Sequence, residues 1–472
     1  MKICKKSSTD KFLLSTKQIL FSYGMIVFAL LVCLNMFEHT TISHVSGYAI
    51  VSFLVNGLLW FIMLINELAK KSYSLLFIIW FFCLYFFFFA GFTQYLNGSF
   101  PWISYDYTDS NIFVFNICLL LWSFFLILGT KICRDKHTEV LMVDCTPILK
   151  IISTFVFVSI AICVYRISKV GFVNLLSRET SSLSVSDNGS LSMIVDKLLM
   201  SMMYFSAAYS ILYYRKTKIK LPMMICCFCM LIAYFPTGSS RNVIAGLYLG
   251  CFLLMFPSLK HNHFFSILLI FSFMIVFPFL NAFRNTSFVD VDIGLAIKRV
   301  IDNLSTEWLA GDYDAYSMFG LTYNYVSDYG SAFGHQLLGV VFFFIPRSIW
   351  KTKPYGSGYF IADNLGWNFK NVSCPLPGEM LINFGVIGML ICVLLFGILI
   401  KWLDNGFWQN KYDDNFGVFE PLYCYMVGYF LFVCRGDLLS SFAYLSSVIV
   451  VWLLINGHLL LRGLRIKNFK CF

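Results

Sequence analysis

The sequence predicts an all-α integral membrane protein that crosses the bilayer about twelve times. Of its 472 residues, 59% are hydrophobic and only 13% are charged, whereas a soluble globular protein carries about 25% charged residues. The 52 Phe and 26 Tyr residues add apolar surface that a soluble core of this size cannot cover. These observations exclude a soluble enzyme and a disordered scaffold, and they favour a polytopic membrane protein.

Residues 1–280 contain nine long apolar runs, and residues 379–472 contain three more. A membrane-spanning helix needs about 17 to 25 apolar residues. The seventh and eighth runs are short, so a hairpin that does not fully cross is an alternative for this pair. The twelve predicted spans are Ile19–Met36, Val45–Ile65, Tyr73–Phe92, Ile112–Gly129, Ile148–Tyr165, Leu198–Tyr214, Leu221–Phe235, Val243–Phe256, Phe264–Leu280, Met380–Ile400, Val418–Val433 and Leu439–Leu461.

Basic residues at both ends of the chain decide the parity of the spans. Cytoplasmic segments of membrane proteins are enriched in Lys and Arg, so both ends are expected in the cytoplasm and the number of spans is even. The net charge of +10 then reflects basic loops at an anionic membrane surface, and no nucleic-acid partner is expected. The residues concerned are Lys2, Lys5, Lys6, Lys11 and Lys17 in the amino-terminal segment, and Arg462, Arg465, Lys467 and Lys470 in the basic tail.

With twelve spans, residues 281–378 form one large extracytoplasmic loop between spans nine and ten. Within it the apolar run Gln336–Ile345 has ten residues and ends at Pro346, which is too short for a span and predicts a re-entrant or interfacial segment at 336–345. The loop mixes charges of both signs with aromatic runs such as 312–316, so we expect it to fold on the membrane surface. Long outside loops usually carry function, which predicts that the protein works at its outer face.

Four arginines are predicted at the outer edge of the membrane: Arg241, Arg284, Arg347 and Arg435. Arginine is costly within a membrane and needs a partner, and its planar fork suits the oxygen atoms of a phosphate group. Converging arginines therefore predict a diphosphate clamp, with interfacial snorkelling as the alternative for each one. Arg241 has a further argument, because residues 238–240 supply backbone amides beside it as an anion-binding nest.

Two residues near these arginines are candidates for acid–base chemistry. His335 precedes the short apolar run, and imidazole can accept a proton near neutral pH; an ordinary interfacial histidine is the alternative. Glu379 follows Pro377 and Gly378 at the outer end of span ten. Its carboxylate is expected either to orient a sugar hydroxyl or to cap a helix N-terminus.

The sequence predicts neither a metal site nor a cofactor. Asp312 and Asp314 have the spacing of an acidic metal-binding pair, but they are expected in the middle of a loop among aromatic residues. Nucleotide-binding, serine-hydrolase and zinc-protease motifs are absent from the sequence. The predicted spans are almost free of ionisable residues in their centres, which disfavours a proton-coupled transporter.

The segment from Phe344 to Gly388 resembles the C-terminal signature of O-antigen polymerases (Wzy), in particular the oligosaccharide repeat-unit polymerase branch. The mid-chain Gly-Ser-Ser-Arg-Asn element at 238–242 is similar to the Gly-Ser-Arg element of that branch, with one additional serine. A dozen spans and large outside loops also match. The resemblance rests on Ile345-Pro346-Arg347, Trp350-Lys351, Lys353-Pro354, Pro377-Gly378-Glu379, Asn383-Phe384-Gly385 and Ile387-Gly388.

The resemblance implies a multi-pass enzyme of the bacterial inner membrane, a GT-C-like glycosyltransferase that needs no metal ion. It would transfer a growing glycan from one undecaprenyl diphosphate to a new lipid-linked repeat unit in the periplasm, with membrane lipid as its surroundings and a chain-length regulator as a candidate partner. His335 or Glu379 would supply the base. The residues that the resemblance assigns to diphosphate are Arg241, Arg284, Arg347, Lys351 and Lys353, with Arg435 as a further candidate.

Two other functions fit parts of this pattern. An O-antigen ligase uses the same lipid-linked donor and would share the arginines, but the repeat-unit polymerase signature favours the polymerase. A flippase for the same lipid-linked glycan should contain internal repeats and polar groups along its spans, and the sequence has neither.

Overall fold

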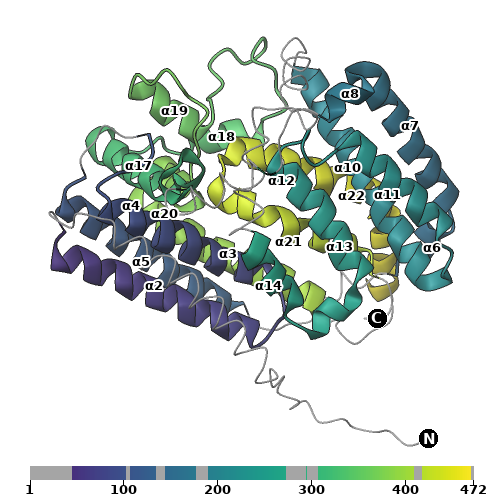
Figure 1. Cartoon of the computed structure of the whole chain (residues 1–472), viewed down its shortest axis with the longest axis horizontal. Coiled ribbons are helices and arrows are strands. Elements are labelled where there is room, and N and C mark those ends of the chain that lie inside the picture. The colour runs from purple at the N-terminus through teal and green to yellow at the C-terminus, as the bar shows by residue number, and fades with distance from the viewer. Residues whose placement is uncertain are drawn as a thin grey trace, which may run out of the picture.

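The computed structural model describes residues 45–102, 107–133, 144–176, 190–272, 294, 307–408 and 417–468. Across these ranges the secondary structure is helical, with no β-strand (Figure 1). The predicted first span and Arg284 lie outside the described residues, as does most of the second half of the predicted ninth span. The predicted all-α class is therefore confirmed for the described part of the chain.

Six of the described helices are long and apolar enough to cross a membrane. Each of them coincides with a predicted apolar run, as expected for a polytopic membrane protein. One of the six is a continuous helical segment, residues 75–96, that consists of α3 (Leu75–Phe82), η1 (Cys83–Ala90) and α4 (Gly91–Leu96). The others are α2 (Gly47–Leu68), α5 (Asp109–Ile132), α7 (Ile152–Val170), α20 (Leu376–Trp408) and α22 (Leu438–Asn468).

The described helices pack into two groups that α21 and α22 connect (Figure 1). In one group α7 and α10 pack against α11, and in the other α2 and α20 pack against α5. The bounds of the further helices are α6 (Thr146–Leu149), α8 (Phe172–Leu175), α10 (Ser190–Thr217), α11 (Leu221–Ala233), α12 (Arg241–Ile244), η3 (Ala245–Leu249), α13 (Gly250–Met255), η4 (Pro257–His261), α14 (Phe264–Phe271) and α21 (Phe419–Arg435).

The segment 75–96 is almost entirely apolar and is buried along nearly its whole length. A helix without a polar face must be surrounded by protein or lipid, and nearly every residue of this segment is buried against other helices. On one side it packs against α2, which is joined to α5 by polar contacts. Trp60 donates from Nε1 to Ser123 Oγ at 2.8 Å, and Asn56 donates to the Asn116 carbonyl at 2.9 Å. Such interhelical hydrogen bonds stabilise helix pairs within a membrane.

The described part of the predicted outside loop, from residue 307 onward, packs closely against the long helices, a burial that the sequence analysis did not predict. Its helices are η6 (Glu307–Leu309), η7 (Gly311–Tyr313), α17 (Ala315–Tyr329), α18 (His335–Val341) and α19 (Ser357–Asn364). The residues from 313 to 322 are fully or almost fully buried against η1, α4, α5 and α20. Tyr316 donates to Asn116 Oδ1 at 3.2 Å, and Gln94 donates to the Trp308 and Tyr313 carbonyls at 2.8 and 2.9 Å. The aromatic side chains therefore fill the core of the protein.

The short apolar run in the same loop forms α18, which has seven residues. Gln336, Gly339 and Val340 are buried where α18 packs against α20 and α22, whereas Leu338 and Val341 are exposed. A helix of this length reaches only about 10 Å. It is too short to span, which agrees with the sequence analysis.

The sequence analysis missed two buried carboxylates. Asp404 lies near the C-terminal end of α20, and Glu420 lies in the first turn of α21. Asp404 has no solvent exposure and accepts hydrogen bonds from the Leu75 and Leu76 amides at 2.9 and 3.3 Å and from the Tyr423 hydroxyl at 2.6 Å. Glu420 pairs with Arg215 at 3.1 Å and with Lys260 at 3.2 Å. These contacts join α3, α10, η4, α20 and α21.

We expect Asp404→Asn to destabilise the protein by about 3 kcal/mol, the cost typical of breaking a buried ionic cluster. Asparagine has one acceptor oxygen in place of two, so either a Leu75 or a Leu76 amide contact is lost, together with the negative charge that lies 3.8 Å from Lys71 Nζ. The measurement is the unfolding temperature of the purified protein in detergent.

The matched control is Asp144→Asn, since Asp144 is exposed and its hydrogen bonds to Thr146 need only one acceptor oxygen. This variant should unfold at the wild-type temperature. Equal unfolding temperatures for the two variants would contradict a stabilising role for Asp404.

Candidate functional site

The first feature of the site is a break in α20 at Gly385, whose φ of 66° and ψ of −173° are not helical. Glycine adopts this backbone conformation without strain. The carbonyl groups exposed by the break are satisfied by the turn before α18, because the Ala332 amide donates to Ile382 at 2.7 Å and the Gly334 amide donates to Asn383 at 2.9 Å. Asn383 Oδ1 also accepts from the Leu337 amide at 2.9 Å. The break is therefore tied by one hydrogen bond to α18 and by two to the turn that precedes it.

Glu379 lies on the short first part of α20 and is 2% exposed. Its Oε1 accepts from the Leu438 amide at 2.8 Å, and its Oε2 accepts from Ser357 Oγ at 2.6 Å. Leu438 is the first residue of α22, so Glu379 caps another helix and not its own. The capping alternative is confirmed in this form, and the role as a base stays a prediction.

Arg347 and Lys353 hold together the loop between α18 and α19. Arg347 donates to the Lys353 carbonyl and, at 3.1 Å, to the Pro354 carbonyl, and its guanidinium lies 3.7 Å from the Tyr355 ring centroid. Lys353 Nζ donates to the carbonyls of Phe343 and Ile345 at 2.7 and 3.0 Å. Burial lowers the pKa of the Lys353 amino group, and the nearby Arg347 charge lowers it further.

Arg241 and Arg435 lie at a different place, where they pair with the two aspartates around η7. Arg241 Nη2 is 2.7 Å from Asp312 Oδ1, and Arg435 Nη2 is 3.1 Å from Asp314 Oδ1. Arg435 Nη2 also donates to the Gly311 carbonyl at 3.2 Å. The two aspartates, expected in the middle of a loop, are instead the anionic partners of two predicted phosphate-binding arginines. The sequence shows only that the two aspartates are separated by one residue. That spacing fits a metal-binding pair as well as it fits two separate ion pairs.

Asp314 connects this arginine–aspartate cluster to the loop of Arg347. It accepts from Trp102 Nε1 at 2.9 Å and from Ser373 Oγ at 2.6 Å. The backbone of Ser373 lies directly against Gly358, where an added Cβ would come within 2.9 Å of the Ser373 carbonyl oxygen. Gly358 directly follows Ser357, which donates to Glu379. The arginine–aspartate cluster and the Glu379 site are therefore adjacent.

The other predicted site residues are less closely connected. His335 is the first residue of α18 and is exposed, and it lies two residues before Leu337, whose amide donates to Asn383. Lys351 is exposed in the same loop as Arg347. Among the described residues, no group of three or more His, Cys, Asp or Glu side chains is arranged to hold a metal ion.

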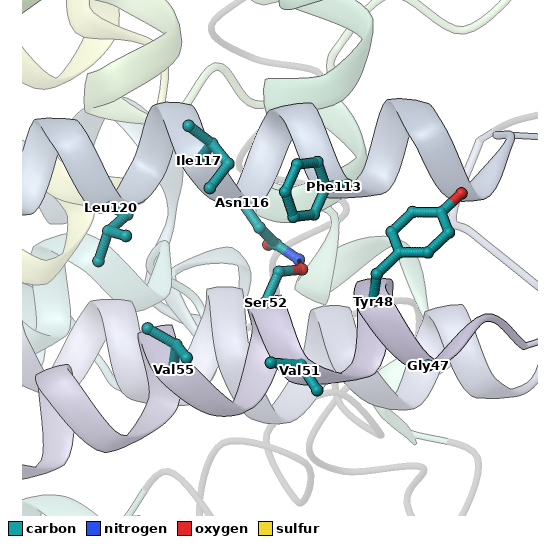
Figure 2. Close-up of a pocket in the computed structure, with 9 residues that line it drawn as sticks. All are labelled: Gly47, Tyr48, Val51, Ser52, Val55, Phe113, Asn116, Ile117 and Leu120. Atoms are coloured by element: carbon teal, nitrogen blue, oxygen red, sulfur yellow. Dashed lines mark hydrogen bonds between the residues drawn. The ribbon is translucent and has the colours of Figure 1, made fainter.

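A separate pocket of about 380 Å³ lies between α2 and α5 (Figure 2). Its walls are apolar, formed by Tyr48, Val51, Val55, Phe113, Ile117 and Leu120. Ser52 and Asn116 point toward one another across its floor, where Asn116 Nδ2 donates to Ser52 Oγ at 2.8 Å. The pocket contains none of the predicted site residues, and its lining suits an apolar chain better than a sugar.

We expect Asp314→Asn to loosen the arginine–aspartate cluster. Asp314 is 1% exposed, and the change leaves Arg435 without its counter-charge, which is costly in a buried position. Hydrogen–deuterium exchange should be about tenfold or more faster for the amides of residues 311–314 and 373. Asp328→Asn, an exposed position at the other end of α17, should leave the exchange rates unchanged; similar rates in both variants would contradict this role of Asp314.

Comparison with known proteins identifies no relative of this chain. No family model matches it, and no curated protein and no solved structure is significantly similar to it. The assignment of a function therefore depends on the residue pattern and on the contacts described above.

Proposed function

We propose that the protein is a glycosyltransferase of the O-antigen polymerase type, in the bacterial inner membrane. It would transfer a glycan from undecaprenyl diphosphate to the next lipid-linked repeat unit on the periplasmic side. One observation carries the proposal: hydrogen bonds tie the residues of the Wzy-like segment into two groups, which the short stretch 353–357 connects. Arg347 donates to the carbonyls of Lys353 and Pro354. Ser357, three residues after Pro354, donates to the Glu379 carboxylate, and the Glu379 backbone carbonyl accepts from Asn383 beside the break at Gly385.

A twelve-span topology with a GT-C-like arrangement is part of the proposal. In it the loop 281–378 faces the periplasm and both chain ends face the cytoplasm, as the distribution of Lys and Arg favours. The six long apolar helices support a membrane-spanning body. The pocket between α2 and α5 supports a lipid-linked substrate, since a prenyl chain needs an apolar surface.

Within the proposed site, Arg347 is the best candidate for the diphosphate. Arg241 and Arg435 are neutralised by Asp312 and Asp314. Arg347 donates to neutral carbonyl groups and forms no ion pair with any described residue, so its positive charge is not compensated there. A diphosphate leaving group gains negative charge as the glycosidic bond breaks, and a fixed guanidinium stabilises that charge.

The acceptor hydroxyl must lose a proton as it attacks the anomeric carbon. Glu379 and His335 remain the two candidates for the base, and they differ in their surroundings. Glu379 is buried and hydrogen-bonded to Ser357 and Leu438, whereas His335 is exposed on α18. The Glu379 carboxylate is the better ordered of the two.

The proposal is tested with purified protein in proteoliposomes supplied with undecaprenyl-diphosphate-linked repeat units. The wild-type protein should produce a ladder of polymerised glycan. Arg347→Ala should lower the rate by about 30- to 150-fold, which corresponds to a lost charge-assisted contact of about 2 to 3 kcal/mol. Arg347→Lys should remain impaired, because an ammonium group cannot bind a diphosphate bidentately.

Lys370→Ala is the matched control. Lys370 is a basic residue of the same loop that pairs with Asp363, and its removal should leave the rate unchanged. A wild-type protein that makes no ladder would refute the polymerase function. A normal ladder from Arg347→Ala would refute the assignment of the diphosphate to Arg347.

The same assay identifies the base. Glu379→Gln preserves the geometry, since the amide oxygen can accept from Leu438 while the amide nitrogen donates to Ser357 Oγ. If Glu379 is the base, this variant should lose about 100- to 10,000-fold in rate, and His335→Gln should be nearly normal. The reverse result would assign the proton transfer to His335, and normal rates in both variants would exclude general-base catalysis by either residue.

A further inference from the structure

Asp437 is a carboxylate of the site that neither the sequence pattern nor the proposed chemistry uses. It directly precedes α22 and accepts from the Leu439 amide through Oδ1 at 2.9 Å. Through Oδ2 it accepts from the Gly358 amide at 3.0 Å. One oxygen therefore caps its own helix, and the other holds the start of α19.

The Asp437 carboxylate also lies directly against Gly356. An added Cβ at Gly356 would lie 2.2 Å from Asp437 Oδ2 and 2.4 Å from Oδ1, distances that real atoms do not reach. Glycine at this position leaves room for the carboxylate to approach the backbone. Asp437 thus contacts the segment 356–358 at two points that are two residues apart.

The same segment leads directly to Arg347. Its guanidinium stacks on Tyr355 and donates to the carbonyls of Lys353 and Pro354. Tyr355 also stacks on Tyr359 of α19, with ring centroids 4.4 Å apart. Every described contact that orients the guanidinium is made by residues 353–355, and the backbone that follows them is held by Asp437.

We propose that Asp437 is a positioning residue that fixes the segment 353–358 and so orients the Arg347 guanidinium toward a diphosphate. This inference rests on the proposed function of Arg347 in binding a lipid diphosphate. Asp437 itself makes no contact with the substrate. It holds the donor groups of Arg347 in one orientation before the ligand binds. The side chain and its loop then lose less conformational entropy on binding.

The test measures the binding of undecaprenyl diphosphate to the purified protein, which does not require any turnover. Asp437→Asn has one acceptor oxygen, so it loses either the Gly358 or the Leu439 contact. Gly356→Ala disturbs the same contact from the opposite side. Each variant should raise the Kd about tenfold, whereas Asp363→Asn, an exposed carboxylate on α19, should not change it.

To distinguish positioning of Arg347 from a purely structural role, Asp437→Asn and Gly356→Ala are each repeated in an Arg347→Ala background. If Asp437 acts through Arg347, neither change should weaken binding further, because no guanidinium is left to position. Additive losses in that background, or wild-type affinity in both single variants, would overturn the proposal. If Asp437→Asn does not fold, Gly356→Ala alone decides between these results.

The outcome is separable from the polymerase assay. If the wild-type protein makes no glycan ladder, but both variants raise the Kd tenfold and neither does so in the Arg347→Ala background, the polymerase function is refuted and the positioning role is supported. A glycan ladder with additive losses of affinity would support the polymerase function and refute the positioning role.

Discussion

Two carboxylates of one helix accept the backbone amides that begin two other helices, and most of the described structure depends on them. Asp404, near one end of α20, binds the first amides of α3, and Glu379, near the other end, binds the first amide of α22. Helix N-termini carry unsatisfied donors, and an apolar environment makes each one costly. The two carboxylates of α20 accept hydrogen bonds from these donors on neighbouring helices. In this way α20 fixes where α3 and α22 begin.

The candidate site depends on the hydrogen bond between Glu379 and the first amide of α22. Once Glu379 holds the start of α22, the preceding residues place Arg435 beside Asp314 and place Asp437 beside the start of α19. Ser357 then completes the connection by donating to Glu379. The charged groups of residues 307–378 are therefore arranged by a few backbone contacts between helix ends, and the long apolar helices provide the frame.

The sequence alone was sufficient for the membrane class and for the six long apolar helices, because apolar runs of about twenty residues are rare outside membrane-spanning helices. Arg347 and Lys353 were selected from their place in the Wzy-like segment, and the carbonyl groups that they bind lie within ten residues along the chain. Asp312 and Asp314 were misjudged, because their arginines are 71 and 121 residues away. Pairings over such separations follow from tertiary structure and leave no periodic signal. The burial of α17 was missed for a related reason: aromatic residues fill cores and surfaces alike, and composition does not separate the two.

The break at Gly385 has a consequence for how this sequence can diverge. A side chain at 385 would strain the backbone there, and an apolar residue at 383 would leave the Leu337 amide without its acceptor. Each position therefore tolerates few replacements, for a separate reason: backbone conformation at 385 and the amide acceptor at 383. The apolar neighbours Leu381 and Ile382 are fully buried, so packing limits their replacement as well.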